Sequence, residues 1–169
     1  KKYSFIKNIE NNLIIDGHDW KISERIVIPK NYKLIIKNSS IKFSNDGQLI
    51  SFSPVYIEGS KENPIIISSE VDSLINNKKG GNGILVVNTD EKSFLNYVTF
   101  KNLSAPNLIS GIGLLGSINF YEADVQIYNT SFYSNSLGDD YINIIRSNFD
   151  IENSYFENWP SHKFQKSMF

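Results

Sequence analysis

Hydrophobic and polar residues alternate in short segments along the C-terminal half of the chain, and the alternation recurs after 24 residues. The stretch INFYEADVQIYNTSFYSN (118–135) superposes on INIIRSNFDIENSYFEN (142–158) at that offset. Apolar residues occupy alternate positions within each stretch, which is the period of a strand with one buried face. Five pairs of large apolar residues coincide: Ile118 with Ile142, Phe120 with Ile144, Val125 with Phe149, Ile127 with Ile151 and Phe132 with Phe156.

A less regular copy of the same pattern precedes these two, in GILVVN and SFLNYVTFKN within residues 83–102. Its offset from the next copy is 32, so we expect about eight extra residues to form a loop insertion within residues 103–113. Residues 25–69 continue the rhythm as short alternating segments separated by the turn-forming clusters PKN, KNSS, SNDG and GSKENP.

Short strands at a fixed long period predict a solenoid, in which matched residues of successive turns lie above one another. We therefore predict an all-β fold, a parallel β-helix of roughly five to seven rungs with about 24 residues in each. Residues 1–169 would form one domain, with an N-terminal cap at 11–24 and a C-terminal cap or truncated rung at 159–169. A leucine-rich repeat would need a regular Leu pattern that is absent, and a β-sandwich gives no reason for a repeat of 24.

Two segments resemble recurring motifs of a known family. IEGSKENPIIISS (57–69) resembles a G-T-x-x-x-P-I-x-I turn, and DDYINIIRS (139–147) resembles an E-D-A-L-N-I-x-x-S segment. Together with the repeats, they resemble the right-handed parallel β-helix proteins of the pectate-lyase-like superfamily, and bacterial β-helix repeat proteins associated with CotH-like proteins. The chain departs from that pattern at 160–169, where PSHKFQKSMF replaces an Asp-rich rung.

This resemblance implies a right-handed solenoid, an extracellular or cell-surface location and contact with polysaccharide. It does not imply one activity, because the superfamily includes lyases, epimerases, hydrolases and non-catalytic scaffolds.

Charge and cysteine content exclude several kinds of partner. The 17 basic and 18 acidic residues are dispersed, and the net charge is −1, so we expect no nucleic-acid partner. The chain has no cysteine, which excludes disulfides and thiolate metal sites. No apolar run reaches the roughly 20 residues of a membrane span, so we expect no membrane insertion.

Candidate catalytic residues are few, and we expect no catalytic activity and no cofactor. The enzyme alternative would use Asp139, Asp140 and Asp150 as carboxylates and Arg146 as the base of an eliminating lyase. Ca²⁺ enters only under that alternative, as a bridge between a uronate and the protein. Asp139 and Asp140 also suit a turn, because Asp side chains bond to nearby backbone amides.

Two further acidic pairs, Glu122 with Asp124 and Asp150 with Glu152, are spaced i, i+2, so each could place two carboxylates on one side of a strand. Each pair is a hydrolase candidate, and Glu122 with Asp124 is an alternative Ca²⁺ site. The simpler interpretation is a solvated outer face, on which Glu122 forms an ion pair with Arg146 in the next rung.

Tyrosines alternate with the predicted core residues, so we expect them to point outward from one sheet, where aromatic rings can stack on sugars. This set is Tyr121, Tyr128, Tyr133, Tyr141 and Tyr155. The leading hypothesis is therefore a non-catalytic, surface-associated scaffold or carbohydrate-contacting module, as part of a longer protein. The alternatives are a polysaccharide lyase, epimerase or hydrolase, and an assembly protein of tail-spike type that associates end to end or laterally.

Overall fold

The computed structural model of the chain describes residues 3–44, 46–70, 81–106, 114, 116–133 and 140–157. These residues form eighteen β-strands and no helix, so the fold is all-β. Among them no helix is long and apolar enough to cross a membrane.

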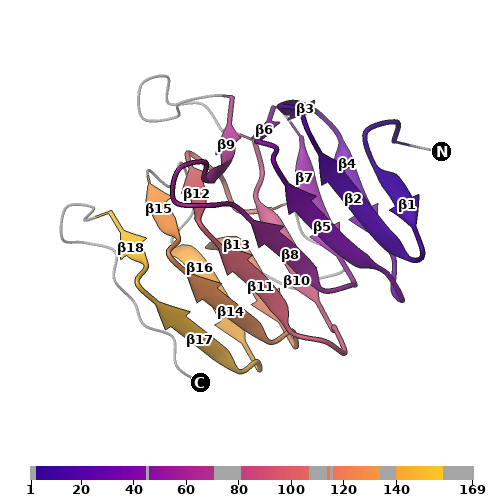
Figure 1. Cartoon of the computed structure of the whole chain (residues 1–169). Helices are drawn as coiled ribbons and strands as arrows, with labels where there is room; N and C mark the ends of the chain where they lie inside the picture. Colours follow the sequence, from indigo (N-terminus) through magenta and orange to yellow (C-terminus); the bar gives the residue numbers. More distant parts are fainter. Residues whose placement is uncertain are drawn as a thin grey trace.

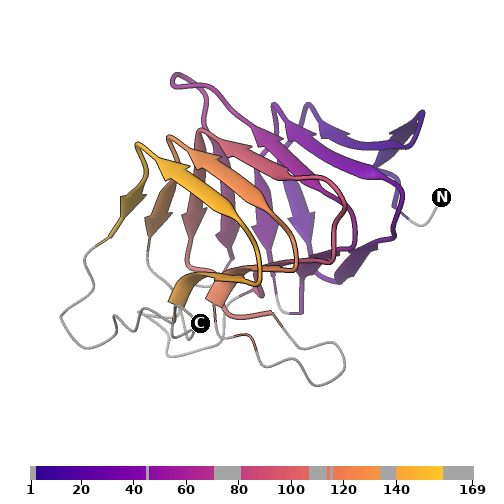
Figure 2. The same cartoon turned by 90° about the horizontal axis from the view of Figure 1, so that it is seen from below.

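The strands form three sheets, called here A, B and C, whose strands lie side by side from the indigo N-terminal end to the yellow end (Figures 1 and 2). Sheet A contains β1 (Lys7–Ile9), β2 (Asn12–Asp16), β5 (Lys33–Lys37), β8 (Val55–Glu58), β11 (Ser93–Asn96), β14 (Val125–Tyr128) and β17 (Phe149–Glu152). Sheet B contains β3 (Trp20–Ile22), β6 (Ile41–Phe43), β9 (Ile65–Ser69), β12 (Val98–Lys101), β15 (Ser131–Tyr133) and β18 (Tyr155–Phe156). Sheet C contains β4 (Arg25–Ile28), β7 (Gln48–Ser51), β10 (Ile84–Val87), β13 (Gly116–Tyr121) and β16 (Asp140–Ile145).

From β2 onward the chain visits sheets A, B and C in turn, and we call one such passage a circuit. Strands of successive circuits pair in parallel within each sheet. In the last two circuits the register is the one that the sequence predicts, with Ile118 opposite Ile142 and Ile127 opposite Ile151. The offset of 24 residues holds only there, because β2 pairs with β5 at an offset of 21 and β8 with β11 at 38.

The loop insertion within residues 103–113 is predicted from an offset of 32, and β12 and β15 pair at that offset. Fourteen residues (102–115) separate β12 from β13, whereas six (134–139) separate β15 from β16, so the earlier connection is eight residues longer. Residues 107–113 of this insertion lie outside the described residues.

The main core lies between the three sheets and is built from ladders of alternate residues in register. On sheet B, for example, Phe100 lies opposite Phe132, and Phe132 lies opposite Phe156. Their ring centroids are 5.2 and 4.6 Å apart, and both ring pairs are stacked. Identical residues recur in the sequence because each circuit buries its apolar side chains against the same kind of side chain in the next.

Sharp corners join the sheets, and asparagine suits those between A and B. Asn38, Asn129 and Asn153 each follow a strand of sheet A and have φ of 48°. Asn tolerates this left-handed conformation better than other residues with a side chain beyond Cβ, because its short polar group bonds locally. These corners therefore account for part of the high Asn content of the chain.

The N-terminal end differs from the prediction, because residues 11–24 contain β2 and β3, which pair in parallel with β5 and β6. The expected cap at 11–24 is thus wrong. Instead β1 pairs antiparallel with β2, and Tyr3, Phe5 and Ile6 pack against the core. The predicted C-terminal cap at 159–169 lies outside the described residues.

Candidate functional site

The outer faces of the three sheets differ in how far they are open. On sheet C a second apolar cluster covers the outer side of β7 and β10, with Ile50, Leu85 and Leu114 buried at its centre. The outer faces of sheets A and B carry partly or fully exposed side chains instead. Sheets A and B therefore have the more open outer faces, on which an extended ligand could lie.

An apolar and aromatic ladder crosses the outer face of sheet A. Ile14, Ile35, Tyr56 and Phe94 lie opposite one another in register on β2, β5, β8 and β11, and each is partly exposed. Their neighbours in the chain on either side, such as Leu34 and Ile36, point into the core, so the alternation of the strand presents this set to solvent. We call these four residues together with Tyr128 the sheet A stripe.

Tyr128 extends the stripe through polar contacts as well as through its ring. The ring lies edge-on to that of Phe94, with the centroids 5.8 Å apart. Its hydroxyl donates to Asp150 Oδ2 at 2.7 Å and accepts from Gln126 Nε2 at 3.1 Å. The hydrogen bond to the Asp150 carboxylate raises the pKa of Tyr128.

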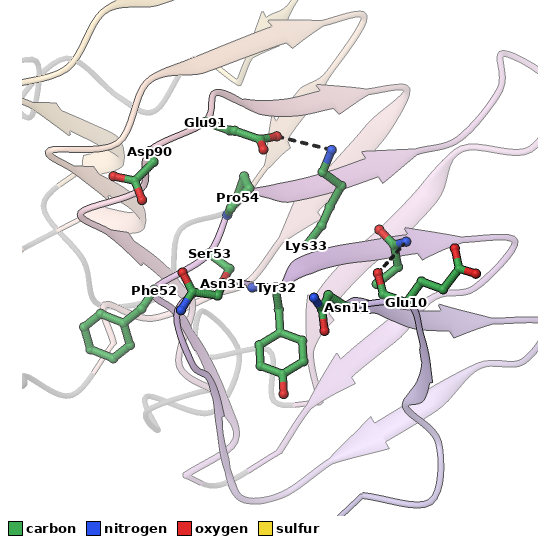
Figure 3. Close-up of a pocket in the computed structure, with 11 residues that line it drawn as sticks. Glu10, Asn11, Asn31, Tyr32, Lys33, Phe52, Ser53, Pro54, Asp90 and Glu91 are labelled. Carbon is green, nitrogen blue, oxygen red and sulfur yellow. Dashed lines mark hydrogen bonds and ion pairs between the residues drawn. The ribbon is translucent and has the colours of Figure 1, made fainter.

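A hollow of about 250 Å³ lies where the corners that precede β2, β5, β8 and β11 come together, as Figure 3 shows. Lys33 joins this hollow to the stripe, because its ammonium lies 4.5 Å from the ring centroid of Tyr56 and 3.3 Å from Glu91 Oε2. Desolvation lowers the pKa of Lys33, but the bonds to Glu91 and Tyr56 outweigh it and raise the pKa overall. The other lining residues are mainly polar: Glu10, Asn11, Asn12, Asn31, Tyr32, Phe52, Ser53, Pro54 and Asp90.

The five predicted tyrosines do not form one row, because the structure distributes them over all three sheets. Tyr128 lies on sheet A, Tyr133 and Tyr155 on sheet B, and Tyr121 and Tyr141 on sheet C. Tyr141 also fails to point away from the core, since its ring packs against the main core 6.4 Å from that of Phe156. Of the predicted set, Tyr128 alone belongs to the stripe.

The candidate catalytic residues are not brought together. Asp140 begins β16, and Arg146 follows its end, so six residue steps of about 3.3 Å separate their backbones by roughly 20 Å. Asp150 lies on another sheet, on β17. Asp139 lies outside the described residues.

Asp140, Asp150 and Arg146 each have a structural partner, which for Asp150 is the Tyr128 hydroxyl. The Asn143 side-chain amide is oriented with its nitrogen toward Asp140 and its oxygen toward the Gly116 N–H, and it donates to Asp140 Oδ2 at 2.8 Å. Arg146 donates to Glu122 Oε1 at 3.2 Å, as predicted, and to the Tyr121 hydroxyl at 3.0 Å.

Glu122 and Asp124 do not form the predicted pair on one side of a strand. Both lie in the corner between β13 and β14, and Glu122 has φ of 51°, so the alternation of a strand does not apply to them. Asp124 accepts hydrogen bonds from the Asn148 side chain at 3.1 Å and the Asn148 backbone N–H at 2.7 Å, which lower its pKa. No group of three metal-ligating side chains occurs in the part of the chain that the structure describes.

Sequence reasoning missed Tyr56, Phe94 and Lys33. For Tyr56 and Phe94 the signal is local, because VYIE and SFLN each place one outward side chain between two buried residues of a sheet A strand. Lys33 is the first residue of β5 and carries no such signal. No family model, no curated protein and no solved structure matches the chain.

Proposed function

We propose that this chain is a non-catalytic carbohydrate-contacting module built on a right-handed parallel β-helix, and that the sheet A stripe is its contact surface. The proposal follows the resemblance to pectate-lyase-like proteins, and it includes the extracellular or cell-surface location that this resemblance implies.

The cyclic order of the strands supports the β-helix. Within the described residues, each complete circuit adds one parallel strand to each of the three sheets, and no strand returns to an earlier edge. Connections between parallel strands of one sheet are right-handed in about 98% of cases, which favours a right-handed coil here.

The sheet A stripe is the observation that carries the proposed function. Sugar rings present apolar C–H faces, and flat aromatic side chains spaced along a rigid sheet can stack on several of them at once. Adjacent strands are about 4.8 Å apart, so an extended oligosaccharide lying across the strands would meet Ile35, Tyr56, Phe94 and Tyr128 in succession. Parallel strands hold these side chains in place before binding, which limits the entropy that binding costs.

Polar groups beside the stripe suit sugar hydroxyls. Asn96 lies opposite Tyr128 in the register of β11 and β14, and Gln126 lies opposite Phe94. Amide side chains can donate and accept together, as a hydroxyl requires. The separation of Asp140 from Arg146 supports a binding role over a lyase site that uses both.

Binding to a panel of glycans tests the proposal. The purified chain would be run in native gels containing a neutral glucan, a soluble chitin derivative, chitosan or a polyuronate, and a retarded band would identify a ligand. Tyr56→Ala combined with Phe94→Ala should weaken binding at least about tenfold, or ~1.4 kcal/mol, because exposed aromatic anchors dominate such contacts.

Tyr155→Ala is the matched control, since Tyr155 is 52% exposed but lies on sheet B. It should leave binding unchanged. Retardation by none of the glycans, or equal weakening by the control, would refute the proposed contact surface. Thermal unfolding of each variant checks that the fold is intact.

A further inference from the structure

The charges on the outer face of sheet A are not balanced. Both lysines on its parallel strands have anionic partners, since Lys33 pairs with Glu91 at 3.3 Å and Lys37 with Asp16 at 3.9 Å. Within the described part of the chain, no cation pairs with the carboxylates of Glu58, Asp150 or Glu152. Lys37 lies opposite Glu58 in register but pairs with Asp16, so the face keeps a net negative charge that is greatest around Asp150 and Glu152.

These carboxylates bracket the aromatic part of the stripe. Glu58, Asn96, Tyr128 and Glu152 follow one another in a single ladder across β8, β11, β14 and β17. Three strand spacings separate the two glutamates, or roughly 14 Å, and both side chains are exposed. Phe94 lies beside this ladder, and Asp150 is held at the Tyr128 hydroxyl.

We infer that the glycan bound by the sheet A stripe carries protonated amines, as a polymer of amino sugars does. A ring that stacks on Phe94 or Tyr128 would bring an ammonium substituent close to Glu58 at one end or to Asp150 and Glu152 at the other. An ammonium also interacts favourably with aromatic faces, so the rings and the carboxylates select the same charge. A polyuronate would place carboxylates against carboxylates and is disfavoured.

This inference rests on the proposed function, because it names the class of glycan for the same surface. It also differs from the polyuronate that a lyase alternative would require.

Calorimetric titration with three hexasaccharides tests the inference: glucosamine hexamer, N-acetylglucosamine hexamer and galacturonic acid hexamer, at pH 5.5 and low salt. We expect the glucosamine hexamer to bind at least tenfold tighter than its N-acetylated form, and the galacturonic acid hexamer to bind most weakly. The advantage of the glucosamine hexamer should fall several-fold between 25 and 250 mM NaCl, because exposed charge pairs are screened.

The variant Glu58→Gln/Glu152→Gln should reduce the preference for the free amine to less than about threefold and leave binding of the N-acetylated hexamer unchanged. The matched control, Glu24→Gln/Asp46→Asn, removes the same charge from exposed positions in corners between sheets B and C and should keep the full preference.

The two proposals fail in different ways. Equal binding of the free and N-acetylated hexamers, or tighter binding of the galacturonic acid hexamer, overturns the inference and leaves the contact surface standing. Hexalysine is titrated as a control that carries the charge without the sugar rings. Equal binding of hexalysine and the glucosamine hexamer also overturns the inference, because charge alone would then suffice. Absence of binding by all three hexasaccharides overturns the inference, and it overturns the proposed function as well when no glycan of the native-gel panel retards the chain.

Discussion

Phe132 lies at the centre of the stacked core, and its truncation tests the register of the circuits most severely. The side chain is 1% exposed, and its ring is parallel to that of Phe156 at 4.6 Å and stacked on that of Phe100 at 5.2 Å. Phe132→Ala removes the middle ring of three and leaves a cavity that the rigid neighbouring strands cannot close.

The expected loss is about 3–5 kcal/mol, the usual range for Phe→Ala in a core. Ring stacking contributes roughly 0.5–1.5 kcal/mol of this for each pair. Since a domain of this kind is stable by only about 5–15 kcal/mol, the variant should lose about a fifth or more of its stability. Phe156→Ala should cost less than half as much, because Phe156 is partly exposed in the last circuit.

Urea unfolding followed by circular dichroism measures these losses, and a double-mutant cycle isolates the contact. Phe132→Ala and Phe156→Ala should show a coupling of about 1 kcal/mol. As a control, Phe132→Ala combined with Phe52→Ala should be additive within ~0.5 kcal/mol, because Phe52 packs against the separate cluster outside sheet C. A loss below about 1 kcal/mol for Phe132→Ala, or no coupling with Phe156, would refute the stacking.

Three further changes probe the corners and the close contacts between circuits. Gly83→Ala should prevent folding or cost several kcal/mol, measured by urea unfolding, because its Cβ would overlap the backbone carbonyl oxygen of Ser117. Asn153→Ala should cost about 1 kcal/mol in the same assay and Asn153→Gly a few tenths, since Asn153 has φ of 48°; equal losses would contradict the left-handed corner. The pKa of Asp124 is lower in the folded chain than in the unfolded chain, so its carboxylate stabilises the fold fully at any pH above the unfolded-state pKa. This stabilisation is lost as the pH falls through the folded-state pKa. The gap in urea midpoint between wild type and Asp124→Asn should therefore narrow from pH 7 to pH 2, and a widening gap would contradict the bonds to Asn148.

The sequence predicts the pairing of the last circuits well, because identical side chains recur there at one offset. Ile127 opposite Ile151 and Phe132 opposite Phe156 follow from subtraction alone. Residues in register on neighbouring parallel strands pack against each other, and similar side chains pack well in this arrangement. The repeat in the sequence and the register in the sheet therefore have the same cause.

The contact face could not be derived in the same way. The offset between the sheet A strands that carry Ile35, Tyr56 and Phe94 changes from 21 to 38, so no single period aligns these residues. The alternation of the tyrosines with core residues predicts that they lie outside the core, but alternation distinguishes only inside from outside. It does not say which of three sheets a residue occupies, and it fails at corners such as Glu122, where φ is positive.

Mapping the bound glycan by NMR tests the central claim of a contact face on sheet A most directly. Backbone amide shifts of the ¹⁵N-labelled chain would be followed during titration with the glucosamine hexamer and, separately, with the N-acetylglucosamine hexamer. The account predicts that the shifts caused by whichever hexamer binds cluster on β5, β8, β11 and β14, around Tyr56, Phe94 and Tyr128. Shifts that cluster instead on sheet B around Tyr133 and Tyr155, or no shifts with either hexamer, would contradict it.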